Sequence, residues 1–282
     1  MNEGIAVAIQ GERGSFSEEA AVRLLGAETA IRCCEHFEDV FRLTANSECR
    51  YCVIPIENSL AGSIHKNYDL LLRYGLKIIL ETNLRIRHNL IAHPGVSLEE
   101  IKTVISHPVA LDQCETLFER YPHFTKKSAY DTSGSVKRIM ENNLRDHAAV
   151  AGKRAAEFYG GEILEEDVED NKENFTRFFL LSASLETPQT ANKTSIVFSF
   201  KNAPGALFKS LSVFALRDID LSKIESRPIA GRPWEYLFYV DFLANLEEQR
   251  SRNALNHLRE ITEFLEVLGS YPRDETQEKK GM

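Results

Sequence analysis

Apolar runs of strand length alternate with amphipathic stretches over the first part of the chain. The odd positions from Ile5 to Ile9 are apolar, and further short apolar runs stand at 51–56, 103–105 and 148–151. A polar corner and then a stretch with helical spacing follow each run. Strands alternating with helices predict a mostly parallel α/β sheet. In such sheets ligands bind at the carboxyl ends of the strands, so we expect the polar corners to lie together.

The apolar pattern also predicts how the chain is divided. A long apolar stretch at 76–92 carries two arginines, Arg85 and Arg87, near its middle, which indicates a strand that crosses between two subdomains with a cleft. These subdomains form a first domain at 1–184. A polar, proline-bearing linker follows at 185–193.

The remainder of the chain has a different pattern. Residues 194–273 predict the order βαββαβ, which is the split-βαβ or ferredoxin-like arrangement. Residues 274–282 are mostly charged or polar, and we expect a disordered tail there. The predicted fold class is therefore α/β, with a two-lobed first domain and a smaller second one.

Composition narrows the class of protein. The 282 residues carry a net charge of -8 and show no block of Lys and Arg, so nucleic acid and anionic membranes are not expected partners. The start lacks the features of a secretory signal, and no apolar run approaches the roughly 20 residues that span a bilayer. We expect a cytoplasmic protein. Its five cysteines predict free thiols rather than a metal site, because the pair Cys49 and Cys52 is not followed by a second pair.

Polar corners supply the first candidate binding residues. Glu57, Asn58, Ser59 and Gly62 follow the apolar run at 51–56. Carboxylate, amide and hydroxyl groups beside a glycine suit recognition of a polar ligand. A solvated loop with a capping serine explains the same residues.

Two later corners repeat this arrangement. Ser106 and His107 precede a proline placed at the first turn of a helix predicted at 108–121. Thr132 stands before a helix predicted at 135–142. The alternative for His107 is a helix cap.

The segment Asn174–Phe178 joins an acidic, polar run to an apolar strand. Alternation along a strand points Thr176 and Arg177 to opposite faces. The planar fork of an arginine grips a carboxylate at two points, so the segment is a candidate clamp for an anion. The alternative is an edge arginine paired with the nearby acids.

These motifs occur together in one known family. Residues 55–59 (PIENS), 106–108 (SHP), 131–132 (DT) and 174–178 (NFTRF) follow one another in the family's order, and the chain resembles prephenate dehydratase. The second domain resembles the ACT regulatory domain of the same enzymes. There, Pro204, Gly205, Ala206 and Leu207 form one signature, and Glu225, Ser226, Arg227 and Pro228 form the other.

The resemblance implies an activity. It implies a monofunctional enzyme with a two-lobed catalytic domain of the type 2 periplasmic-binding fold, which converts prephenate to phenylpyruvate, water and carbon dioxide in L-phenylalanine biosynthesis. The reaction needs no metal and no organic cofactor. The ACT domains would pair subunits into a homodimer or tetramer and bind L-phenylalanine as a feedback inhibitor. Val109 departs from the family, which usually carries glutamine there.

Roles for the candidate residues follow from the resemblance. Thr176 would act at the leaving hydroxyl, Arg177 would hold a carboxylate or the loops, and Glu57 or His107 would supply a proton. The residues expected to bind substrate are Asn58, Ser59, Gly62, Ser106, Thr132, Asn174 and Phe178. Those expected to bind phenylalanine are Asn202, Pro204, Gly205, Ala206, Leu207, Glu225, Ser226, Arg227 and Pro228. Arogenate dehydratase and a non-catalytic amino-acid sensor remain alternatives.

Overall fold

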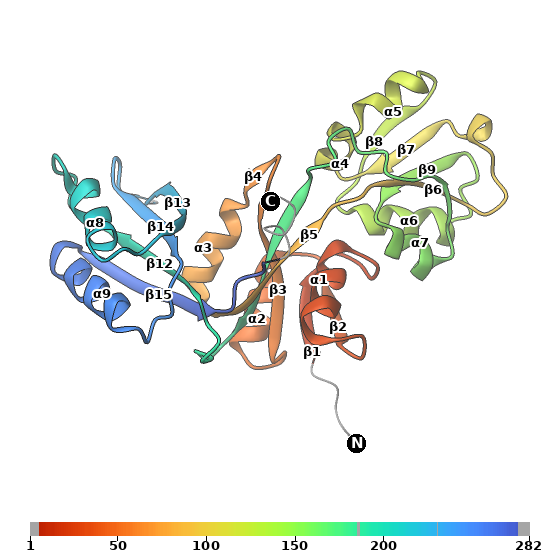
Figure 1. The fold of residues 1–282 in the computed structure, drawn as a ribbon. Coiled ribbons are helices and arrows are strands. Elements are labelled where there is room, and N and C mark those ends of the chain that lie inside the picture. The colour runs from red at the N-terminus through yellow and green to blue at the C-terminus, as the bar shows by residue number, and fades with distance from the viewer. Residues whose placement is uncertain (1–5, 185–186, 230, 276–282) are drawn as a thin grey trace. The chain divides into compact units, whose positions relative to one another are not determined.

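The computed structural model describes residues 6–184, 187–229 and 231–275. Its internal contacts divide the chain into two units, described separately below (Figure 1). Unit 1 comprises Met1–Tyr74 and Thr82–Phe178, and unit 2 comprises Gly75–Glu81 and Phe179–Met282. The domain boundary expected at 185–193 stays a prediction. Ile5, part of the linker and most of the expected tail lie outside the described residues.

The first lobe of unit 1 is built on a six-stranded sheet. The strand order is β2-β1-β3-β11-β5, and β4 pairs with β3. β1 runs parallel to both neighbours, as the alternation of strands and helices predicts. The strands are β1 (Ala6–Gln10), β2 (Ala30–Cys34), β3 (Tyr51–Asn58), β4 (Gly62–Ser63), β5 (Lys77–Arg85) and β11 (Phe175–Ser182). The helices are α1 (Phe16–Leu25), α2 (Phe37–Ala45) and α3 (His65–Tyr74).

The second lobe contains a five-stranded sheet of order β10-β6-β9-β7-β8. β7 runs parallel to β8 and β9, whereas β6 is antiparallel to β9 and β10. The strands are β6 (Asn89–Ala92), β7 (Thr103–Ser106), β8 (Thr125–Ser128), β9 (His147–Ala151) and β10 (Glu162–Glu165). The helices are the 3₁₀ turn η1 (Leu98–Glu100), α4 (Pro108–Asp112), α5 (Glu115–Arg120), α6 (Thr132–Glu141) and α7 (Lys153–Tyr159).

Helices cover both faces of this second sheet (Figure 1). Ala148 and Val150 on β9 pack in one apolar cluster with residues of α4 and α5. The intervening Ala149 and Ala151 pack with residues of α6 and α7 in another. Period-two alternation in one strand therefore supplies both layers of the core.

The chain passes between the two sheets twice. β5 leads through 86–88 into β6, and β10 leads back into β11. The crossing expected at 76–92 is thus confirmed, with the strand broken near His88.

Unit 2 has the order β12-α8-β13-β14-α9-β15, so the predicted βαββαβ pattern is confirmed. Its sheet order is β13-β14-β12-β15. Ile196, Phe198, Val240 and Phe242 form its core with residues of both helices. The elements are β12 (Lys193–Ser199), α8 (Ala206–Ala215), β13 (Leu221–Pro228), β14 (Tyr236–Phe242), α9 (Gln249–Ile261) and β15 (Phe264–Tyr271).

Two predicted helices differ in the structure. The single helix expected at 108–121 is two helices, because the Asp170 carboxylate accepts from the N–H groups of Glu115 (2.7 Å) and Thr116 (3.0 Å) and starts a new helix there. α6 begins at Thr132 rather than at residue 135, because Asp131 is its N-cap and accepts from the Gly134 N–H.

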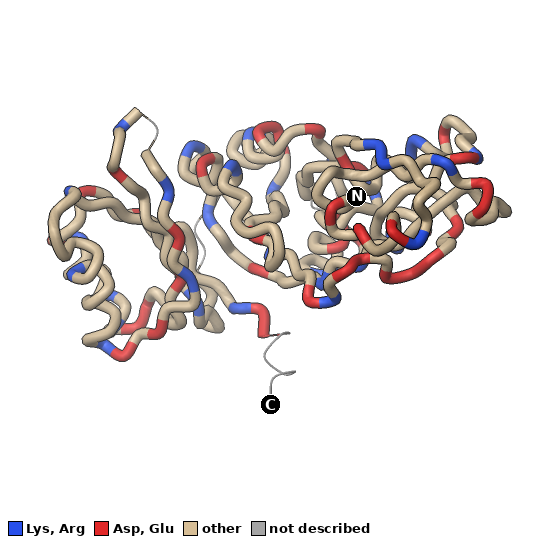
Figure 2. The backbone as a smooth tube through the Cα atoms, turned by 90° about the horizontal axis from the view of Figure 1, so that it is seen from above, with Lys and Arg blue, Asp and Glu red and all other residues tan. Residues whose placement is uncertain are grey.

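Charged residues of both signs are interspersed along the described backbone (Figure 2). Among the described helices, none is both long and apolar enough to cross a membrane.

Candidate active site

A cavity of about 410 Å³ lies in unit 1 and is lined by residues of both lobes. Its wall includes residues at or next to the first turns of five helices, namely Ser17, Phe37, Ile64, Val109 and Thr132. The first N–H groups of a helix have no intrahelical acceptor and carry partial positive charge. No Lys or Arg is found among the described residues that line it. An anion in the cavity would therefore meet helix starts rather than cationic side chains.

Thr176 lines this cavity and is held by Asn58. The Oδ1 atom of Asn58 accepts from the N–H groups of Leu60 (3.0 Å) and Ala61 (2.8 Å), which fixes which way the amide points. Its Nδ2 atom then donates to Thr176 Oγ1 at 3.0 Å. Because Oγ1 accepts this bond, the threonine's own hydrogen is available to an acceptor in the cavity.

Asn174 and Ser59 hold the start of β11 without lining the cavity. Asn174 is fully buried, and its Oδ1 atom accepts from Asn58 Nδ2 at 2.8 Å. Ser59 Oγ donates to Glu173 O (2.8 Å) and accepts from the Phe175 N–H (2.9 Å). Both residues thus position Thr176 from behind.

Three other candidates lie away from the cavity wall. Arg177 is buried on β11 beside Thr176 but is not among the lining residues, as the opposite-face prediction requires. Ser106 is fully buried and donates to Val150 O at 2.6 Å, so it joins β7 to β9. Glu57 pairs with Ser63 in the β3–β4 hairpin. None of these three residues lines the cavity.

Gly62, His107, Thr132 and Phe178 do line the cavity. His107 is the N-cap of α4, and its Nδ1 atom accepts from the Val109 N–H at 3.3 Å, so this residue does cap the helix. The neutral ring then carries its hydrogen on Nε2. Val109 also lines the wall and is 42% exposed. It places an apolar group where the family's glutamine would be polar.

Several polar residues that line the cavity were not assigned roles from the sequence, among them His88, Gln113 and Asp131. Burial lowers the pKa of His88 to about 4, so its imidazole is neutral near pH 7. Burial raises the pKa of Asp131. The N–H groups of Gly134 and Glu12, which donate to its carboxylate, act to lower this pKa but do not outweigh burial. Asp131 is the one carboxylate among the described lining residues.

The β1–α1 loop of the first lobe is bound by the second lobe. The carboxylate of Glu18 is fully buried and meets both Arg13 and Arg154 at 3.0 Å, while the Gly14 N–H donates to it at 2.6 Å. Burial alone would raise the pKa of Glu18, but these donors outweigh it and lower the pKa. Gly14 has a φ of 77°, and a Cβ atom there would lie 2.7 Å from Ala155 Cα. The close approach of the lobes at this loop therefore requires glycine.

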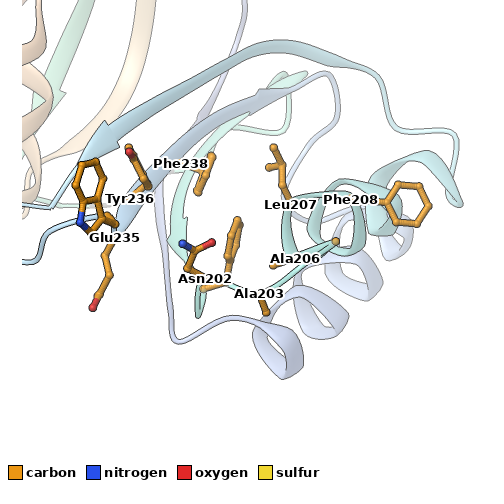
Figure 3. Close-up of a pocket in the computed structure, with 11 residues that line it drawn as sticks. Asn202, Ala203, Ala206, Leu207, Phe208, Glu235, Tyr236 and Phe238 are labelled. Carbon is orange, nitrogen blue, oxygen red and sulfur yellow. The ribbon is translucent and has the colours of Figure 1, made fainter.

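A second cavity, of about 250 Å³, lies in unit 2 (Figure 3). Tyr236 and Phe238 of β14 lie on one side and Ala206 and Leu207 of α8 on the other. Gly205, with a φ of 78°, is the N-cap of α8. The lining thus combines aromatic rings with the free N–H groups of a helix start, a combination that suits an aromatic amino acid.

Only part of the expected phenylalanine site is brought together here. Asn202, Gly205, Ala206 and Leu207 line this cavity, but Pro204 and residues 225–228 do not. Residues 225–228 end β13, which is an edge strand of the sheet. Within one chain, this cavity is therefore lined by residues of the first signature and by none of the second.

Comparisons with known proteins agree with this geometry. A model of the prephenate dehydratase family matches residues 7–185. The chain belongs to the prephenate dehydratase family. It is thus a member of a family of dehydratases, as the motif order predicted.

Individual relatives match nearly the whole chain. The arogenate dehydratase/prephenate dehydratase 2 of Arabidopsis thaliana is 46% identical over 283 residues, which is 96% of this chain and 74% of the relative. Prephenate dehydratase from Arthrobacter aurescens, solved in complex with L-Phe, is 30% identical with a TM-score of 0.87, covering 97% of this chain and 92% of that one. GqqA, described as a quorum-quenching acylase, is also 30% identical with a TM-score of 0.87, covering 96% and 98%.

The expectation of a cytoplasmic protein is contradicted. The curated relatives include chloroplastic proteins of Arabidopsis thaliana. The prediction was wrong because the composition of a water-exposed enzyme surface is the same in both compartments.

Within the described residues, no cluster of three or more His, Cys, Asp or Glu side chains is arranged to hold a metal ion. Burial raises the pKa of Cys33 to about 11 and that of Cys52 to about 12, so both are thiols rather than thiolates at neutral pH.

Proposed function

We propose that this protein converts prephenate to phenylpyruvate, water and carbon dioxide in the cavity of unit 1, and that L-phenylalanine inhibits it by binding unit 2. The observation that carries the first part is the placement of Thr176, which lines the cavity and whose Oγ1 atom accepts from Asn58 Nδ2. Membership of the prephenate dehydratase family supports the reaction class.

Prephenate carries two carboxylates, and the cavity suits both. The helix starts contributed by α1, α3 and α6 provide N–H donors, and the hydroxyls of Ser17, Ser63 and Thr132 line the same wall. Preorganised neutral donors in a partly dry site hold anions without the added desolvation of a buried Lys or Arg. Arg177 has no direct part in this scheme.

The reaction requires that a ring hydroxyl leave while the carboxylate on the opposite (para) ring carbon departs as carbon dioxide. The electrons of the broken carbon–carbon bond enter the ring, which becomes aromatic, and the leaving hydroxide takes up a proton to become water. The Thr176 hydroxyl donates a hydrogen bond to that oxygen as negative charge develops on it. His107, with its hydrogen on Nε2, is an exposed donor in the lining and the residue to which we assign proton donation. Glu57 does not line the cavity and takes no proton-donor role in this scheme.

A second substrate is favoured by a specific observation. Arogenate differs from prephenate by an ammonium group in place of the side-chain ketone. The Asp131 carboxylate in the cavity wall is a partner for that ammonium group. The names of the plant relatives point the same way.

The deciding experiment supplies each substrate to the purified protein. Prephenate turnover is followed by formation of phenylpyruvate, and arogenate turnover by formation of phenylalanine. We expect turnover of prephenate. Turnover of arogenate alone would make the protein an arogenate dehydratase, and turnover of neither would favour an amino-acid sensor.

The regulatory part of the proposal requires two subunits. We place the phenylalanine carboxylate at the start of α8 and its ring against Tyr236 and Phe238, with the signature at 225–228 supplied by a second copy of the chain. Alternate residues of edge strand β13 are exposed, including Ile224 at 48%. Unit 2 is then an ACT domain that pairs subunits into a homodimer or tetramer. Phenylalanine inhibits if it favours a global arrangement in which the cavity of unit 1 is less competent.

A further inference from the structure

Hydrogen bonds continue from Asn58 beyond Asn174 to two residues outside the motifs. Asn174 Nδ2 donates to Gln113 Oε1 at 2.9 Å, and His88 Nε2 lies 3.3 Å from the same oxygen. Asn174 Oδ1 already accepts from Asn58, so the Asn174 amide presents its N–H side to Gln113. The atom of Gln113 that faces both neighbours is therefore an acceptor.

This polarity determines the tautomer of His88. Since Gln113 Oε1 can only accept, His88 Nε2 must carry a hydrogen and donate it. The other ring nitrogen, Nδ1, is buried and has no hydrogen-bond partner among the described residues. A charged ring would bury an unpaired N–H group there, which is costly, so the neutral ring with hydrogen on Nε2 is the form that fits.

The backbone and ring of His88 are held from several sides. Its N–H donates to Glu169 Oε2 at 2.9 Å, and its carbonyl accepts from the Val168 N–H at 2.7 Å. Its ring meets that of Phe16 edge-on at 5.8 Å between centroids. His88 stands where β5 gives way to β6, and Gln113 stands at the break between α4 and α5. The chain of hydrogen bonds from His88 to Thr176 thus starts at a residue that is held in place just before β6.

We propose that His88 is a positioning residue for the dehydration, whose neutral ring orients Gln113 and, through Asn174 and Asn58, the hydroxyl of Thr176. This proposal rests on the proposed function of Thr176. Each amide in the series can point only one way. Without the His88 donor, the Gln113 amide can rotate. Asn174 and then Asn58 lose their fixed orientation, and Asn58 is the residue that holds Thr176.

Two substitutions of similar size distinguish the hydrogen bond that His88 donates from the space that its ring fills. His88→Gln keeps an N–H donor near the position of Nε2, whereas His88→Leu fills space without a donor. We expect His88→Leu to lower kcat about tenfold with a smaller change in KM, because a misplaced catalytic group slows the chemical step. His88→Gln should restore most of the loss. Equal losses in both variants, or no loss in either, would overturn the proposal.

A double-mutant cycle tests whether His88 acts through Thr176. In a Thr176→Ala background, His88→Leu should cause less than a twofold further loss of kcat, because the group that it positions is already gone. A full tenfold further loss would assign His88 a separate, packing role and overturn the proposal.

A spectroscopic measurement does not depend on turnover or on variants that fold poorly. In wild-type protein labelled with ¹⁵N-histidine, His88 should show a protonated Nε2 and a bare Nδ1 at neutral pH, with its signals identified by their absence in His88→Gln. The opposite tautomer or a doubly protonated ring would overturn the proposal. If wild-type protein turned over neither substrate, the proposed function would fail while this tautomer assignment could still hold.

Discussion

The two cavities of the molecule differ in how many of their expected residues one chain brings together. In unit 1, residues from sequence positions as far apart as Asn58 and Thr176 meet within hydrogen-bond distance, and each amide is oriented by its neighbour. In unit 2, one signature lines the cavity and the other stands on an edge strand outside it. The proposed catalytic site is lined by residues of one chain, whereas the proposed regulatory site needs a second.

The surroundings of the cavity in unit 2 also indicate that a partner covers it. Among the described residues of unit 2, several large apolar side chains are strongly exposed, including Phe208 (75%), Leu216 (76%) and Trp234 (77%). Trp234 also lines the cavity and has a positive φ of 68°, a strained conformation for a bulky residue. Exposed apolar groups around a half-formed site are typical of a surface that a partner covers.

The largest expected effect comes from the complete site. Thr176→Ala should lower kcat for prephenate by about 100- to 1,000-fold, the range for loss of one donor to a developing oxyanion. Thr176→Ser keeps the hydroxyl and should retain most activity. Phenylalanine affinity, measured by calorimetry, should be unchanged. Wild-type turnover by the folded alanine variant would remove Thr176 from the mechanism.

Mixing two damaged chains tests the incomplete site. Leu207→Asp and Ser226→Trp should each weaken phenylalanine binding more than tenfold, because each blocks one signature. In a mixed dimer, one of the two sites would receive both intact signatures. Calorimetry should then show about one recovered site for each mixed dimer. Recovery of no sites would indicate that both signatures act within one chain.

Two of the glycines with positive φ, Gly14 and Gly205, give a smaller contrast. Gly14→Ala should destabilise by about 3 kcal/mol, because left-handed strain adds to the contact with the Ala155 backbone. Gly205→Ala should cost about 1 kcal/mol, because a Cβ there has nothing within 4 Å. Thermal unfolding of the two variants compares them. Equal losses of stability in the two variants would mean that the β1–α1 loop shifts to make room for the added methyl group.

The smallest effect concerns acid stability. The folded-state pKa of Glu18 lies below its ordinary value of 4.5, so its contribution to stability is present above that pH and is lost as the pH falls through the folded pKa. Glu18→Gln should be less stable than wild type at pH 7, and the difference should shrink toward pH 3. Denaturant titrations at both pH values measure it. A difference that does not change with pH would exclude this ion pair as the source.

Much of the fold followed from periodicity, but the site depended on contacts far apart in sequence. The pattern of apolar runs predicted both the βαββαβ order and the crossing at 76–92. It missed the break at Gln113, because that break is made by Asp170, which lies 55 residues from Glu115. It also missed His88, because a single histidine in an apolar stretch carries no local sign of a distant amide partner.

Strand direction was a better guide to the site than charge. Alternation in 174–178 placed Thr176 and Arg177 on opposite faces, and only Thr176 lines the cavity. The attraction between a guanidinium group and an anion suggested a role for Arg177 in binding. We propose helix starts for that role, which a sequence pattern shows only as capping residues.

The boundary between the units has a practical consequence for protein engineering. β5 and β11 each begin in one unit and end in the other, since Lys77–Glu81 and Phe179–Ser182 belong to unit 2 while the rest of each strand belongs to unit 1. On the unit 2 side, Lys77 meets Glu266 at 2.6 Å and Phe179 meets Tyr271 ring to ring at 6.0 Å. A chimaera that exchanges the regulatory part between relatives must therefore carry these two strand ends with it. A simple splice in the connecting segment would leave foreign side chains facing each other along both strands.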